Sequence, residues 1–318
     1  MTVLGLALCL SLVAFAAIGV ATSLALYPVT RAVLGTRDQS SRTLGMLRLL
    51  PILLAGVVAG LWVLPGFLWL EPRDSAERVT PALLLLTLAA LLVIATGLFR
   101  GARAIATTRS LVRGWRRGAA PIPVSGLGAP ALAVDDPFPV VAIAGILKPR
   151  LYVSRRVLAA LSREELAAVV EHEAAHLRRR DNLVRLVLCA CPDPLAWSPH
   201  GEALERAWSA ATERESDAVV GSESRRLDLA SALVKVARLA EGRSLTISAA
   251  AAFYAGDPIA DRVKRLLEPA EAPRAASPRM RLGISIAMAG VMLLLADTEP
   301  TLLRDVYAVT EGFVRLLQ

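Results

Sequence analysis

Cysteine and histidine are scarce in this sequence, because its 318 residues contain only three of each. Cys9 lies in one apolar run, and Cys189 and Cys191 lie in another, separated by a single residue. This spacing predicts neither a disulfide framework nor a paired-cysteine metal site. We interpret the cysteines as small apolar residues in buried positions.

Aromatic residues are also few, at 5%, whereas hydrophobic residues make up 55% of the chain and the mean hydropathy is +0.52. Such an Ala-, Leu- and Val-rich balance is typical of apolar helices in lipid. The net charge of +8 does not indicate a nucleic-acid partner, since arginine clusters beside apolar spans follow from the positive-inside rule. The composition therefore predicts a membrane protein whose partner is the lipid bilayer, with no direct contact to nucleic acid.

Three apolar runs are long enough to cross a bilayer, for which about 20 residues suffice; they are residues 3–26, 49–70 and 81–99. A fourth run, 282–296, is shorter and lies at the boundary between a tilted span and a buried or interfacial helix. We therefore expect three N-terminal spans in residues 1–100, a domain in 101–280, and a fourth span with a short tail in 281–318.

Arginines next to these runs predict the orientation of the chain. The connection after the first run carries Arg31, Arg37, Arg42 and Arg48. The segment after the third run has six arginines and no acidic residue among them: Arg100, Arg103, Arg109, Arg113, Arg116 and Arg117. Both segments are therefore expected in the cytoplasm, together with the domain at 101–280. In the tail, apolar residues from 303 to 317 recur at helical spacing, which predicts a helix along the outer membrane surface.

The first part of the predicted domain is rich in glycine and proline, so it cannot form a long helix. Four short β-compatible runs are separated there by turn residues: 122–125, 131–134, 140–144 and 150–153. They predict a small sheet in front of a helical region. The fold class we expect is a mainly α membrane protein with a cytoplasmic α+β domain.

The sequence HEAAH lies on a helix whose start is marked by Ser162 and Glu165, a capping-box pattern. His172 and His176 are four residues apart, so their imidazoles project from one helix face about 6 Å apart and can bind one zinc ion. Glu173 is then placed beside the metal, where a carboxylate can take a proton from a zinc-bound water and pass it to a leaving amine. The competing interpretation is a helix with two solvated or buried structural histidines.

Catalytic zinc requires a third protein ligand, and three downstream residues are candidates on spacing alone: Glu213, Glu215 and His200. Residues 202–220 have a helix-forming composition, so Glu213 and Asp217 share one face. Asp217 can then accept a hydrogen bond from the second nitrogen of a ligating histidine. His200 is predicted to lie in a loop, and spacing leaves the choice among the three open.

Taken together, these motifs resemble the BlaR/MecR-type membrane zinc peptidases, a gluzincin family that regulates antibiotic-resistance genes in bacteria. The resemblance rests on five stretches: 145–153, 161–166 leading into HEAAH, 179–182, 194–197 and 213–217. It implies a gluzincin-like zinc peptidase domain on the cytoplasmic side of the bacterial plasma membrane, with Glu213 as the third zinc ligand. It also implies that the strand near residues 142–144 offers its edge to a substrate; a merely structural strand is the alternative.

One departure from the family concerns the end of the chain. The β-lactam-sensing members carry a large extracellular sensor after their last span. In this sequence about twenty residues follow the predicted fourth span, which are too few for such a domain. The resemblance therefore implies a zinc endopeptidase without that sensor, acting on a cytoplasmic repressor or a membrane protein. Two alternatives stay open: a non-catalytic signalling or scaffold protein stabilised by zinc, and a quality-control protease of the HtpX type. The sequence does not determine the substrate, the activating signal, self-cleavage or the oligomeric state.

Overall fold

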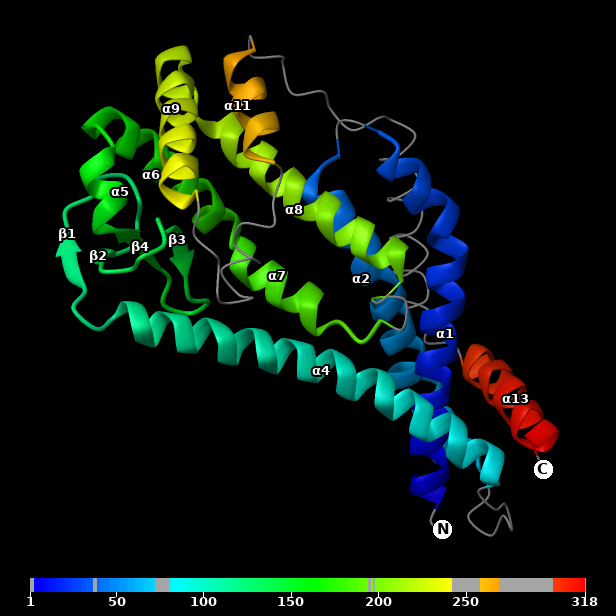
Figure 1. Ribbon diagram of the computed structural model, residues 1–318. Coiled ribbons are helices and arrows are strands. Elements are labelled where there is room, and N and C mark those ends of the chain that lie inside the picture. The colour runs from blue at the N-terminus through cyan, green and yellow to red at the C-terminus, as the bar shows by residue number, and fades with distance from the viewer. Residues whose placement is uncertain are drawn as a thin grey trace.

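A computed structural model describes residues 3–36, 39–71, 80–193, 196, 198–241, 258–268 and 300–317 (Figure 1). It is mainly helical with one small sheet, which confirms the predicted fold class. The predicted fourth span at 282–296 lies outside the described residues.

Three helical segments are long and apolar enough to cross a membrane: Val3–Leu34, Ser41–Leu70 and Pro81–Trp115. They contain the three predicted spans. The first is α1, the third is α4, and the second consists of α2 (Ser41–Val58), a π-helical turn η1 (Ala59–Val63) and α3 (Leu64–Leu70). Helices α1 and α4 continue past their apolar runs, because polar residues end a membrane span without ending a helix.

Apolar side chains fasten the membrane helices to one another, with Leu10 of α1, Phe67 of α3 and Leu83 of α4 in one buried cluster. The amphipathic tail forms α13 (Pro300–Leu317), which packs on this cluster. Tyr307 lies 5.2 Å from the Phe67 ring, and its hydroxyl donates to Glu71 at 2.6 Å. The predicted tail helix is therefore present, and its place on the membrane surface stays a prediction.

The sheet contains β1 (Ala120–Ile122), β2 (Ala131–Val134), β3 (Val141–Ala144) and β4 (Arg150–Ser154), in the order β1-β2-β4-β3. Strands β2 and β4 are parallel, and the other two pairs are antiparallel. The predicted first strand at 122–125 is wrong in its bounds, because β1 pairs with β2 at Ala120, Pro121 and Ile122 and the chain leaves the ladder at Pro123. Strand β3 lies at an edge of the sheet.

Helices enclose the sheet on both sides. One face packs on α6 (Arg163–Arg179), where Val170 and Ala174 meet Leu151 and Val153 of β4. On the other face, Trp115 at the end of α4 packs on Tyr152, with 5.3 Å between the ring centroids. Because α4 also crosses the membrane region, this helix joins the sheet to the spans (Figure 1).

The remaining helices lie on either side of α6 in the sequence. They are α5 (Arg155–Ala160) before it, then α7 (Asp181–Ala190), α8 (Pro199–Val219), α9 (Glu223–Ala240) and α11 (Ile259–Leu267). Helix α7 packs on α4, whereas α8 contacts both α6 and the membrane helix α2. Residues from the membrane region and the helical domain therefore meet along α8 (Figure 1).

Candidate metal centre

The helix α6 begins and ends at well-defined residues. Ser162 accepts a hydrogen bond from the Glu165 N–H at 3.1 Å, and the Glu165 carboxylate accepts one from the Ser162 N–H at 2.7 Å. This is the predicted capping box. The helix ends where Arg180 adopts a left-handed conformation, with φ of 56°. Both histidines of HEAAH therefore lie on one continuous helix.

The two imidazoles meet at their Nε2 atoms, which are 3.1 Å apart. The Glu213 carboxylate approaches from α8, with one oxygen 3.5 Å from Nε2 of His172 and the other 3.7 Å from Nε2 of His176. Ligand atoms of a tetrahedral zinc site with bonds of 2.0–2.1 Å are separated by about 3.3 Å. The donor set and its spacing are therefore compatible with a metal ion such as zinc held by two histidines and one glutamate.

The two other candidate ligands lie elsewhere. Glu215 accepts hydrogen bonds from the backbone and the hydroxyl of Ser41, at 2.7 and 2.6 Å. His200 is 2.6 Å from the Thr30 hydroxyl. The prediction that His200 lies in a loop is wrong, because Ser198 caps α8 and Pro199 occupies its first turn, so that His200 is already helical. Of the three, the structure brings Glu213 to the histidines.

The Nδ1 nitrogen of each imidazole lies next to a carboxylate. Asp217, one turn after Glu213, places Oδ1 3.0 Å from Nδ1 of His172. Asp181, the first residue of α7, places Oδ2 2.6 Å from Nδ1 of His176. The Asp181 contact is a hydrogen bond that fixes the tautomer of His176 and leaves its Nε2 for a metal, and the charge of Asp217 favours the same tautomer in His172. Asp181 also pairs with Arg179, which donates to it at 2.7 Å.

Arg262 of α11 is a site residue that sequence reasoning missed. Its guanidinium contacts Asp217 at 2.7 Å and Glu213 at 2.9 Å, and its Nη2 lies 3.4 Å from Nε2 of His172. Leu266 of the same short helix is buried in an apolar cluster with α9, which holds α11 in place. No motif in the sequence marks this arginine, because α11 and α8 are far apart along the chain.

Burial and charge change the proton affinities of the site. Burial raises the pKa of Glu173 above its ordinary value, although both histidines oppose that shift. Burial would likewise raise the pKa of Glu213, but hydrogen bonding to His172 and the charge of Arg262 lower it strongly. Burial disfavours the charged form of His172, yet hydrogen bonds to Asp217 and Glu213 raise its pKa to about 9. The site therefore contains several paired charges. Among its carboxyl groups, Glu173 has a raised pKa.

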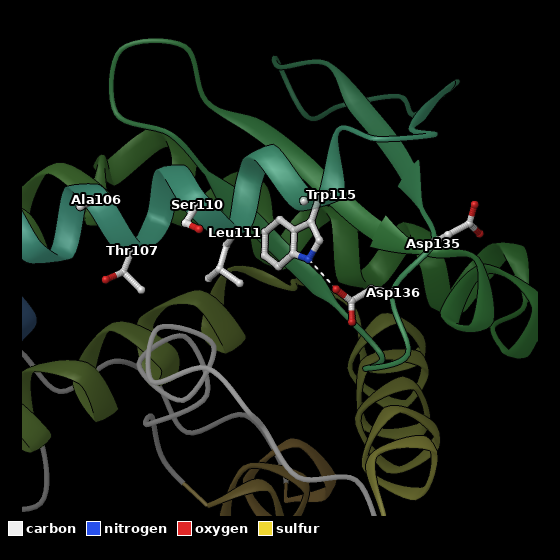
Figure 2. Close-up of a pocket in the computed structure, with 8 residues that line it drawn as sticks. Ala106, Thr107, Ser110, Leu111, Trp115, Asp135 and Asp136 are labelled. Atoms are coloured by element: carbon white, nitrogen blue, oxygen red, sulfur yellow. Dashed lines mark hydrogen bonds between the residues drawn. The ribbon is translucent and has the colours of Figure 1, made fainter.

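A cleft of about 580 Å³ lies apart from this cluster, at the end of α4 (Figure 2). Its carboxylates already have partners: Asp136 accepts from the Trp115 indole at 2.7 Å, and Asp135 lies 3.0 Å from Arg155. None of the three candidate metal ligands lines it. The cleft is therefore separate from the candidate metal centre.

The apolar helices and the HEAAH site define this protein as a membrane metallopeptidase in its general class. A family model described as BlaR1 peptidase M56 matches residues 72–266, which is more than half of the chain. The chain belongs to this family, which confirms the resemblance predicted from the sequence. No curated protein matches the chain.

Proposed function

We propose that this protein is a zinc-dependent endopeptidase with Glu173 as its general base. The observation that carries the proposal is the convergence of three donor atoms from His172, His176 and Glu213, all within 4.8 Å of one another. Asp217 and Asp181 orient the two imidazoles toward the same point. A solvated surface helix would not need this arrangement of buried carboxylates behind its histidines.

Each residue of the site has a separate role in the proposed peptide hydrolysis. A zinc ion bound there would supply Lewis acidity that polarises the scissile carbonyl and acidifies a water molecule. Glu173 takes the proton of the attacking water and delivers it to the leaving amine, a role that its raised pKa favours. Arg262 balances the charge of Glu213 and Asp217, so these buried carboxylates remain ionised.

The edge strand β3 supports an extended peptide as substrate. Ser154 donates to the Val140 carbonyl at 2.8 Å, so by the alternation of an antiparallel ladder Ile143 directs its backbone groups away from β4. The Asn182 side chain donates to the Ile143 carbonyl at 2.8 Å and ties the strand to the start of α7. A substrate backbone is proposed to pair along this edge by β-augmentation and, at Ile143, to replace the Asn182 contact.

We further propose that the enzyme is a multi-pass protein of the bacterial plasma membrane with its site on the cytoplasmic side. The arginine-rich segments after the first and third spans support that orientation. We propose regulatory cleavage of a cytoplasmic repressor or a membrane protein as its physiological function, rather than general quality control. Proteomic comparison with a Glu173→Gln strain separates the two, since a regulator leaves one or a few proteins uncut and a housekeeping protease leaves many.

The decisive experiment measures zinc content and peptide cleavage of the Glu173→Gln protein. We expect zinc to be retained and cleavage to fall by about 10²–10⁴-fold, the usual contribution of general acid–base catalysis. Glu171→Gln is the matched control, because it makes the same change two residues earlier on α6, and it should cleave normally. Wild-type cleavage by Glu173→Gln would end the proposed mechanism. A metal with four protein ligands and no exchangeable water would instead favour a structural role.

A further inference from the structure

Two faces of helix α8 make contacts that bear on the metal site, one with α6 and one with α2. Toward α6 it presents Glu213 and Asp217, which reach the histidines. Toward the membrane helix α2 it presents Trp208, which is buried with Leu44 and lies over Gly45, where an added Cβ would be 3.6 Å from the indole nitrogen. Figure 1 shows α8 lying across α2 between the spans and the helices of the domain. Any shift of α8 against α2 therefore moves Glu213.

Glu215 makes a specific contact on the membrane-helix face. Residues two apart on a helix point about 200° apart, so Glu215 faces α2 while Glu213 faces the histidines. Its carboxylate accepts from the Ser41 N–H at 2.7 Å and from the Ser41 hydroxyl at 2.6 Å. Ser40, at the N-cap of α2, makes no side-chain capping bond. Glu215 thus supplies the acceptor that the first turn of α2 needs, and its negative charge suits the helix N-terminus.

A second set of contacts links the same region to the other ligand helix. Arg179, near the end of α6, donates to the Thr212 carbonyl at 3.1 Å and the Ser216 hydroxyl at 2.6 Å. Its Nε is 3.8 Å from the Glu215 carboxylate, and its Nη2 is 2.7 Å from Asp181. The turn of α8 around Glu213 is therefore held between α2 on one side and α6 on the other.

We propose that Glu215 is a positioning residue for the metal site. By binding the first turn of α2 it fixes the rotation of α8, and so holds the Glu213 carboxylate at the distance from His172 and His176 that the metal needs. This inference rests on the proposed metal-dependent function. It makes a membrane-spanning helix part of the support of the metal site, although no residue of α2 is a ligand.

The test measures Zn²⁺ and Co²⁺ affinity of the full-length protein in detergent, together with the visible absorption spectrum of bound Co²⁺. Glu215→Ala should raise the dissociation constants about tenfold, as expected when a group that supports a ligand is removed, and should change the cobalt spectrum through a misplaced Glu213. Glu205→Ala is the control, because Glu205 is an exposed residue of the same helix, and it should match the wild type.

Ser41→Pro tests the contact from the other side without altering α8. Proline removes both donors to Glu215, and it suits the first turn of a helix; the extended backbone of Ser40, with ψ of 135°, accepts a following proline. This variant should reproduce the weaker metal binding, and the double variant should be no weaker than either single one. Wild-type affinity and cobalt spectra in both single variants, or additive losses in the double variant, would overturn the proposal.

These outcomes are separate from those for the proposed function. A wild-type chain that binds metal while both variants match it removes only the role of Glu215. A wild-type chain that binds no metal removes both proposals. Cleavage by Glu173→Gln would refute the proposed catalytic mechanism but not the role of Glu215, because the metal-affinity measurements do not depend on turnover.

Discussion

Replacing Asp217 by asparagine probes how the site depends on a residue behind the ligands. Asp217 is buried, and its Oδ1 lies 3.0 Å from Nδ1 of His172 and accepts from Nη2 of Arg262 at 2.7 Å. Its Oδ2 accepts from Nε of Arg262 at 3.1 Å. Asparagine has one acceptor oxygen and one NH₂ donor in the same space. An NH₂ in the place of Oδ1 faces both the imidazole and the guanidinium, whereas an NH₂ in the place of Oδ2 faces the guanidinium alone. In either orientation Arg262 loses an acceptor, and in the first His172 loses its acceptor too.

The expected loss follows from these contacts. Removing a carboxylate that orients a metal-ligating histidine typically weakens metal binding 10–100-fold, which corresponds to about 1.4–2.7 kcal/mol. The structure favours the upper half of this range, because the same substitution also leaves the buried guanidinium of Arg262 without half of its charge compensation. Asp217→Asn should therefore bind zinc about 30–100-fold more weakly at neutral pH while the protein remains folded.

A competition titration against a chromophoric chelator, in detergent and at fixed pH, measures this loss directly. Glu205→Gln, which makes the equivalent change at an exposed position of α8, should titrate like the wild type. An unchanged zinc affinity in Asp217→Asn would refute the reasoning, because it would mean that the metal site does not depend on the negative charge and the second acceptor oxygen that Asp217 provides.

Two further predictions concern the scaffold. Glu165→Ala should destabilise the protein by about 3 kcal/mol, since the buried carboxylate accepts three hydrogen bonds, including one from Lys235 at 2.8 Å. Burial alone would raise the pKa of Glu165, but the bonds from Lys235, Ser231 and the Ser162 backbone lower it. The stabilisation is therefore present above the unfolded value of 4.5 and is lost as pH falls through the folded pKa, so melting curves of the two proteins should converge in acid. Gly97→Ala should cost about 1–3 kcal/mol, because its Cβ would lie 2.7 Å from the Ala190 carbonyl oxygen. Gly114→Ala on the same helix meets nothing within 4 Å and should be neutral or stabilising in the same thermal melt.

Patterns that depend on near neighbours in the chain were predictable. The capping box of Ser162 and Glu165 involves residues three apart, and the pairing of His172 with His176 involves residues four apart. In both cases helix periodicity alone brings the groups together. The three apolar spans were visible for a similar reason, since the length of an apolar run is a local property. Strand limits were less certain, as the early end of β1 at Ile122 shows.

Groups that meet through the packing of separate helices were not predictable from spacing. Glu213 and Glu215 are two residues apart and both acidic, and only the placement of α8 between α6 and α2 directs one to the histidines and the other to Ser41. Arg262 had no local signal at all, because it reaches the site by the docking of α11 on α9.

The sequence by itself determined that the chain carries membrane-length helices and a helix with two histidines and a glutamate on one turn. Spacing left the third ligand open, the family resemblance implied Glu213, and the shared helix face predicted Asp217. The tertiary structure brought both carboxylates to the histidines, added Asp181 and Arg262, and packed α2 against α8. The physical reason is that a helix repeats every 3.6 residues whatever surrounds it, whereas the rotation of one helix against another is set by all the side chains packed between them.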